Sequence, residues 1–249
     1  MPDVRQPERT MEWEVVLRGP ESILTELTHA MKNQPQTIVK TSNGFVLKSP
    51  TFESLTDAGK VRERAVPIVE ALSGICRMLL QSETSLGIGS LVEVTPGGTR
   101  NIFVELEPAV LRITGGMVSM QVIHADGSIE ERRPSDPAPA WLAKALEAPE
   151  AVRALRLRDK GQLSWTDLYR LFEVIIDGAG GDDVIVAEGW ASRTQMRRFK
   201  HSANSVSVAG DEARHGVEST AAPADAMSIS EAKSLVDILL ARWLGKPAV

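Results

Sequence analysis

The chain has 249 residues, of which 43% are hydrophobic and 24% are charged, and its formal net charge is −5. This length and composition fit one large or two small globular domains, and the acidic balance excludes a general attraction to nucleic acid or anionic lipid, so such binding would need a local basic patch. No apolar run approaches the roughly 18 residues needed to cross a bilayer, and the polar N-terminus lacks the apolar segment of a signal peptide, so we expect a cytoplasmic protein with no membrane partner.

The first 133 residues carry the signals of an α+β unit with a mainly antiparallel sheet and two helices. Short runs rich in β-branched residues predict strands, and the turns between them are too short for crossover helices. Asn43-Gly44 between two such runs is the strongest hairpin signal, whereas Gly87 to Gly89 is predicted to form a loop. The expected strands are 12–18, 37–40, 45–48, 91–95, 101–106, 110–114, 118–124 and 128–132.

A short helix is expected after Pro20, and a long helix is expected from Thr56 to Leu80. Apolar residues of the long helix recur at spacings of three and four, which predicts a stripe facing the core. Pro67 interrupts this pattern and predicts a kink or a break, because its nitrogen cannot donate a hydrogen bond. Cys76 lies on the same stripe, so we interpret it as a core residue rather than a nucleophile.

A proline-rich segment at residues 134–139 is the predicted linker between two domains. Before it lies the α+β domain, residues 1–133. After it the apolar periodicity becomes that of helices, which predicts an all-helical domain at residues 140–249. The fold class expected for the whole chain is therefore α+β.

The helical region is expected to contain two short helices, at 141–146 and 151–159, followed by a strongly apolar central helix. That helix begins with a capping pattern at Ser164, and Gly178 is predicted to cap its end. A further capping pattern at Ser228 begins the last helix, in which the apolar side chains, including Ile238, are expected to be buried.

The densest polar stretch of the sequence is residues 193–216, which we expect to form a short helix and a loop. A capping pattern at Ser192 begins this helix. Met196 and Phe199 supply the apolar side of the helix, and its cations lie on the remaining sides. Guanidinium and ammonium groups in such an array would bind phosphate or carboxylate groups. The candidate binding residues are Arg193, Arg197, Arg198, Lys200 and His201.

The loop after this helix offers a second polar cluster. If the loop folds back, the side chains of Arg198, His201, Asn204, Arg214 and His215 would converge. A histidine near its ordinary pKa accepts and donates a proton at neutral pH, and an arginine neutralises a phosphate or an oxyanion. Such a site would suit cleavage of a phosphodiester.

A simpler interpretation of the same stretch is that its cations are solvated or paired with acidic side chains. Asn204 and Arg214 would then cap helix ends and hold the loop to them. The acidic candidates for this pairing are Asp182, Asp183, Glu188, Asp211 and Glu212.

The order of a basic helix, Asn204, a glycine, Arg214-His215 and a closing amphipathic helix resembles the C-terminal region of HEPN-type proteins, and more narrowly the abortive-infection C-terminal domains of phage-defence proteins. The resemblance implies an all-helical, often dimeric domain and, in many members, a metal-independent ribonuclease site shared by two subunits. The family signature is an arginine, a polar residue that is often asparagine, and a histidine a few residues later. This sequence departs from it, because Arg198 to His201 is too short and Asn204 to His215 is too long.

From these signals we expect an interaction or accessory protein, in phage defence or stress response, that binds an anionic partner through residues 193–216. The partner would be another protein, a second copy of the chain, or RNA. The alternative is a metal-independent HEPN-like ribonuclease that uses His215 with Arg214 and Asn204. No cofactor and no metal are expected, because the histidines and glycine-rich segments lack the spacing of metal or nucleotide sites. The chain as a whole resembles bacterial proteins, and this wider likeness implies no activity.

Overall fold

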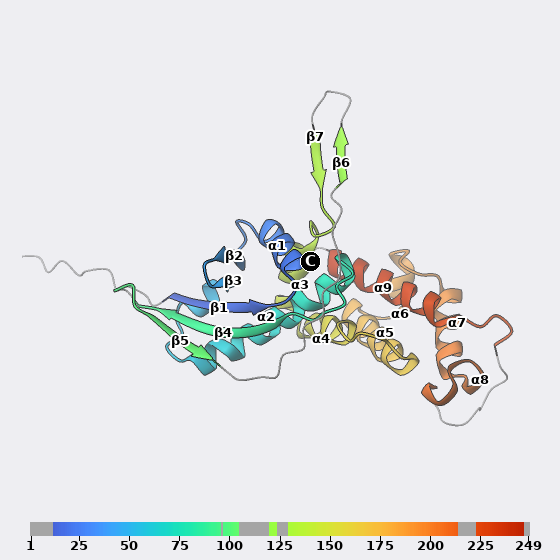
Figure 1. The fold of residues 1–249 in the computed structure, drawn as a ribbon. Helices are drawn as coiled ribbons and strands as arrows, with labels where there is room; N and C mark the ends of the chain where they lie inside the picture. The colour runs from blue at the N-terminus through green and yellow to red at the C-terminus, as the bar shows by residue number, and fades with distance from the viewer. Residues whose placement is uncertain (1–11, 96, 105–119, 124–128, 214–222, 247–249) are drawn as a thin grey trace, which may run out of the picture.

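The computed structural model describes residues 12–95, 97–104, 120–123, 129–213 and 223–246. The N-terminal half contains a five-stranded sheet, and the region after residue 137 is built from helices, as Figure 1 shows. The predicted α+β class is therefore confirmed. Within the described residues, no helix has both the length and the apolar character needed to cross a membrane.

Five antiparallel strands form the main sheet: β1 (Glu12–Arg18), β2 (Thr37–Thr41), β3 (Gly44–Lys48), β4 (Gly87–Val94) and β5 (Arg100–Val104). Their order across the sheet is β2-β3-β1-β4-β5. Alternation along β1 directs Trp13, Val15 and Leu17 into the core. In the neighbouring strands, Leu47 and Leu91 lie opposite Val15 and are buried with it.

The predictions for two glycine-containing segments of the sheet fare differently: one is confirmed and one is wrong. The hairpin predicted at Asn43-Gly44 is confirmed, because β2 and β3 pair directly across this turn. The loop predicted at Gly87 to Gly89 is wrong, because these residues begin β4 and pair with the end of β1. A Cβ on Gly89 would lie 3.2 Å from the carbonyl oxygen of Val16, so the lack of a side chain allows the two strands to approach.

The N-terminal half also contains α1 (Glu21–Ala30), the short 3-10 helix η1 (Pro50–Phe52) and α2 (Ala58–Leu79). The carboxylate of Asp57 begins α2 by accepting a hydrogen bond from the backbone N–H of Lys60 at 3.0 Å. α2 continues through Pro67, so the chain does not break there. Its predicted stripe is buried, and burial raises the pKa of the Cys76 thiol well above its ordinary value, as expected for a core cysteine.

A second sheet has two strands, β6 (Met120–Ile123) and β7 (Ile129–Arg132), which pair with each other. Figure 1 shows this pair projecting away from the rest of the molecule. The short strand expected at 128–132 therefore pairs with its sequence neighbour and not with the main sheet. The strand expected at 110–114 lies outside the described residues.

Seven α-helices and one 3-10 helix are described in the remaining chain, and the helix beginning at Trp165 is central, as predicted. It packs against α4, α6, α7 and α9. The capping patterns at Ser164, Ser192 and Ser228 all form complete capping boxes. The helices are α3 (Ala138–Glu147), α4 (Pro149–Arg158), α5 (Trp165–Ala179), α6 (Asp182–Ala187), α7 (Arg193–Asn204), α8 (Val206–Ala209), η2 (Gly210–Glu212) and α9 (Ile229–Gly245).

The end of α5 corrects two expectations from the sequence. Gly180, and not Gly178, is the C-cap, with a left-handed φ of 96°. Gly178 lies inside the last turn, where a Cβ would overlap the indole ring of Trp243 on α9. α9 buries most of its predicted apolar face against this region, but Ile238 is 50% exposed, so its predicted burial is wrong.

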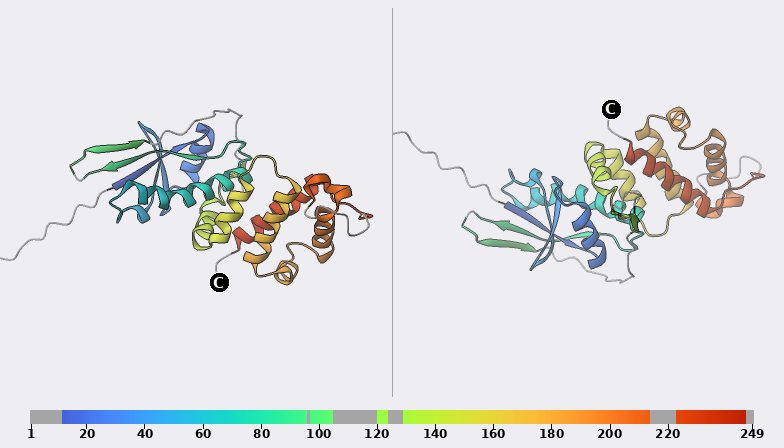
Figure 2. Two further views of the ribbon diagram at one scale, coloured as in Figure 1. Left: turned by 90° about the horizontal axis from the view of Figure 1, so that it is seen from below. Right: turned by 90° about the horizontal axis from the view of Figure 1, so that it is seen from above.

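The sheet and the helical region share one continuous hydrophobic core. As Figure 2 shows, α2 runs along the sheet and reaches α3 and α4. α2 and α4 cross closely at Gly74, where a Cβ would overlap the backbone of Leu155, and Arg77 donates a hydrogen bond to Asp159 at 3.3 Å beside this crossing. The division at residues 134–139 stays a prediction.

Candidate functional site on helix α7

Helix α7, which carries the predicted binding residues, is held by its apolar side. Phe199 is fully buried, and its ring centroid lies 4.7 to 6.3 Å from those of three aromatic rings of α5. At the start of the helix, Ser192 and Gln195 cap each other, with the Ser192 hydroxyl accepting from the Gln195 backbone N–H at 3.2 Å. This anchoring fixes which side chains of α7 are turned away from the core.

Three cations of α7 line a groove between α6 and α7, at the end of the molecule opposite the sheet (Figure 1). They are Arg193, Arg197 and Lys200, whose spacing of four and three residues places them on one side of the helix. The groove has a volume of about 360 Å³. Asp182 and Val186 of α6 form its other wall.

Two of the three cations are paired with carboxylates at the start of α6. Lys200 Nζ lies 2.6 Å from Asp182 Oδ2, and Arg193 Nη2 lies 2.7 Å from Asp183 Oδ1. Arg197 is exposed and makes no hydrogen bond or ion pair within the described part of the chain. Among the described residues, the groove therefore carries one unmatched positive charge, on Arg197.

Lys200 also borders a second hollow, of about 550 Å³, on the side of α7 that faces the end of α5. Its ammonium group lies 5.4 Å from the centroid of the Phe172 ring, which places a cation over the face of an aromatic side chain. Glu173, Asp177 and the Gly180-Gly181 turn also line this hollow. The two hollows thus meet at Lys200.

Arg198, predicted as a binding residue, points to a different part of the molecule. Its guanidinium group donates to the carbonyl oxygens of Asp225 and Ala226, at 3.1 and 2.9 Å, and to the carboxylate of Glu231 at 3.1 Å. Nearby, the hydroxyl of Ser202 accepts from the backbone N–H of Met227 at 2.8 Å. These contacts tie α7 to the segment that begins α9, and they occupy the donors that a ligand would need.

The pKa of Glu231 reflects the hydrogen bonds that meet at the start of α9. Hydrogen bonds from the backbone N–H and the hydroxyl of Ser228, followed by those from Arg198, lower the pKa of Glu231 from its ordinary value of 4.5 to about 2. The carboxylate is therefore ionised at neutral pH while it caps α9. Arg198 reinforces a helix start, which is a structural role.

Of the other predicted site residues, His201 and Asn204 lie within the described residues, both on α7. His201 is partly buried on α7 and is engaged in an interaction. Asn204 is the last residue of α7, and its buried Oδ1 accepts no hydrogen bond from the described residues. Arg214 and His215 lie outside the described residues, so their convergence with Asn204 stays a prediction.

Of the five acidic residues proposed as partners of the basic helix, Asp211 is exposed and pairs with none of the described residues, and the other four divide into two groups. Asp182 and Asp183 do pair with α7, as described above. Glu212 instead accepts a hydrogen bond from the backbone N–H of Trp165, at the start of α5, and Glu188 pairs with Lys246. These two carboxylates therefore stabilise other contacts.

The sequence analysis expects no helix between the central helix and the basic helix, so it misses α6. Two acidic residues directly after a glycine are a signal for a helix start, because their negative charges are stabilised by the positive end of the helix dipole. The missed helix supplies the second wall of the groove.

The comparisons with known proteins assign this chain to no family. No protein-family model matches this chain, and no curated protein or solved structure matches it. The resemblance to HEPN-type domains therefore stays a prediction. Among the described residues, no group of three or more His, Cys, Asp or Glu side chains is arranged to hold a metal ion.

Proposed function

We propose that this chain is a cytoplasmic interaction protein whose α6–α7 groove binds an acidic segment of a partner protein. The observation that carries the proposal is the array of Arg193, Arg197 and Lys200 along one groove, in which Arg197 is exposed and unpaired by any described residue. Guanidinium groups bind carboxylates through paired N–H donors, so Arg197 would be the first contact of an incoming carboxylate.

A carboxylate-bearing partner fits the groove better than RNA does. Arg193 and Lys200 already hold carboxylates at salt-bridge distance, so the geometry suits this group. Among the described residues that line the groove none is aromatic, so it lacks the stacking surfaces with which proteins hold single-stranded bases.

The existing pair at the rim of the groove leaves Arg193 accessible to a partner. The side chains of Arg193 and Asp183 are 69% and 84% exposed. Ion pairs with this exposure contribute about 0 to 1 kcal/mol and are screened by salt. A partner carboxylate can therefore replace Asp183 at little cost.

Fluorescence anisotropy with the full chain tests the proposal. The probe is a fluorescein-labelled peptide of glutamate residues separated by glycine and serine. We expect binding that weakens steeply between about 50 and 200 mM salt, because the contacts are exposed charges. The variant Arg197→Glu should weaken binding about tenfold or more, since it places a like charge at the contact.

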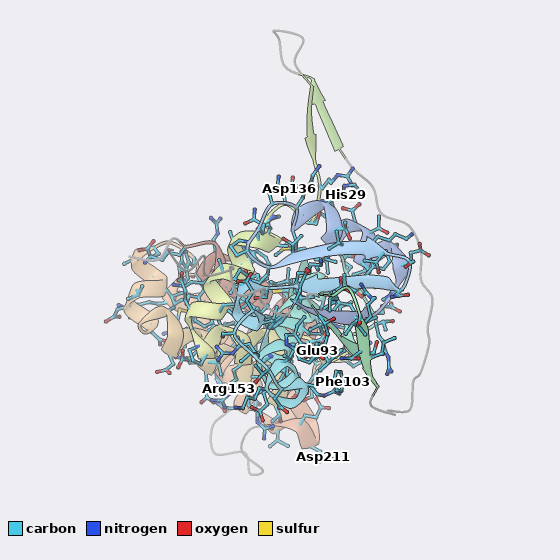
Figure 3. All side chains as sticks on the ribbon, turned by 90° about the vertical axis from the view of Figure 1, so that its left-hand side faces the viewer. His29, Glu93, Phe103, Asp136, Arg153 and Asp211 are labelled. Atoms are coloured by element: carbon cyan, nitrogen blue, oxygen red, sulfur yellow. The ribbon has the colours of Figure 1, made fainter. Side chains whose placement is uncertain are left out.

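The matched control is Arg153→Glu. Arg153 is an exposed arginine on α4 that does not line the groove, and it is labelled in Figure 3. The two variants have the same net charge, so they separate a local contact from the general charge of the protein. The proposal holds if only Arg197→Glu weakens binding, and it fails if both variants weaken binding equally.

The alternative function, a HEPN-like ribonuclease, needs a separate test. The chain and its His215→Ala variant are each incubated with single-stranded RNA in the presence of a chelator. RNA that survives with both proteins supports the interaction role. RNA cut by the unchanged chain but not by His215→Ala would replace the interaction role with the nuclease. The expected role in phage defence or stress response stays a prediction.

A further inference from the structure

The hollow beside the α6–α7 groove has the opposite electrostatic character. Its charged wall on α5 consists of Glu173 and Asp177, both exposed. Asp177 makes no hydrogen bond or ion pair through its side chain within the described residues. The C-terminal end of α5 adds the partial negative charge of its last carbonyl groups. This second hollow therefore suits a cation.

Lys200 joins the two hollows into one surface with two charges. It lines both of them, and its ammonium group is held in place by Asp182 at 2.6 Å and by the ring of Phe172. On one side of it lies Arg197, and on the other side lies Asp177, two charges that no described residue matches. An extended segment that follows this surface passes both charges.

We infer that the partner segment carries charges of both signs, with a carboxylate that binds at Arg197 and a lysine or arginine that binds at Asp177. This inference rests on the proposed function and names the chemistry of the partner. Charge complementarity along the two hollows carries it. The groove alone would accept any acidic segment, whereas the second hollow selects among them.

A uniformly acidic segment is a poorer match to the whole surface. If one of its carboxylates binds at Arg197, another that enters the second hollow meets the carboxylate of Asp177, and like charges repel. A cation at that position removes the repulsion and gains contact with an exposed carboxylate. Specificity would thus arise from a repulsive contact as much as from attractive ones.

The test uses fluorescein-labelled peptides and the full chain. One peptide carries a block of glutamates, a glycine-serine spacer and a block of lysines, and a second carries the same blocks in reverse order. The third peptide replaces the lysines by glutamates. We expect one of the two mixed-charge peptides to bind about tenfold more tightly than the all-acidic peptide.

The variant Asp177→Lys reverses the charge of the second hollow. It should weaken the preferred mixed-charge peptide about tenfold and strengthen the all-acidic peptide, because its new ammonium group now attracts carboxylates. The matched control is Asp211→Lys, which changes an exposed aspartate that lines neither hollow and is labelled in Figure 3. The control should change both affinities less than twofold. Unchanged thermal melting confirms that each variant is folded.

The outcomes separate this inference from the proposed function. If Arg197→Glu weakens the acidic peptide but Asp177→Lys leaves the mixed-charge peptides unchanged, the groove binds acidic segments and the mixed-charge inference is wrong. If Arg197→Glu acts no more strongly than Arg153→Glu, the groove itself is not the site, and both proposals fail. Equal binding of all three peptides also overturns the inference.

Discussion

Among the arginine–aspartate pairs of the described residues, two that join helices lie in different environments. Arg158 of α4 binds Asp237 of α9 through two hydrogen bonds, at 2.5 and 3.1 Å, with side-chain exposures of 6% and 31%. Arg193 of α7 binds Asp183 of α6 through one contact at 2.7 Å, with exposures of 69% and 84%. The residue types are the same, but the surroundings are not.

This difference shows that burial decides what an ion pair does. A guanidinium group that is nearly buried has lost its water, so its fixed partner becomes necessary for the fold. An exposed guanidinium group keeps its water, so its partner is replaceable. The inner pair therefore holds α4 to α9, whereas the outer pair leaves its arginine available for binding.

The largest effect is expected for Asp237→Ala. This change leaves the guanidinium group of Arg158 buried without its two acceptors, and we expect a loss of about 3 kcal/mol in the free energy of unfolding. Urea denaturation followed by circular dichroism measures it. The control is Asp183→Ala, which removes the corresponding acceptor at the surface and should change the free energy of unfolding by less than about 0.5 kcal/mol. Equal losses in the two variants would contradict the comparison.

A smaller loss is expected for Gly178→Ala, at another contact of the buried region. The added Cβ would overlap the indole ring of Trp243, so α5 and α9 must move apart, at a cost of about 2 kcal/mol. Thermal unfolding measures the change. Gly161→Ala is the control, because a Cβ on Gly161 meets no atom within 4 Å. A Gly178→Ala variant as stable as the unchanged chain would show that α9 does not pack tightly on α5.

The buried region is also where the sequence was most informative. Apolar side chains at helical spacing and three capping pairs leave few alternatives, so α2, α5, α7 and α9 were all predicted. Two of the errors fall where a small residue serves packing instead of a turn. Gly178 makes room for Trp243, and Gly89 lets β4 approach β1, but neither partner is adjacent in sequence.

The candidate site was predictable only in part. The spacing of Arg193, Arg197 and Lys200 places them on one side of a helix whatever the rest of the chain does. Which of them lacks a carboxylate partner depends on α6, the short helix that precedes α7 in the chain. The role of Arg198 depends on Glu231, which lies 33 residues later, and no local pattern shows that contact.

The smallest effect is expected for the outer ion pair itself. A double-mutant cycle with Arg193→Ala and Asp183→Ala should give a coupling free energy below about 0.5 kcal/mol, and about 0.5 M salt should abolish it, because both side chains are exposed. Denaturation of the four proteins at low and high salt measures this coupling. A coupling above about 1 kcal/mol that persists in high salt would make the pair a structural contact like that of Arg158 and Asp237. Arg193 would then be committed to the fold, and the groove would keep only Arg197 for a partner.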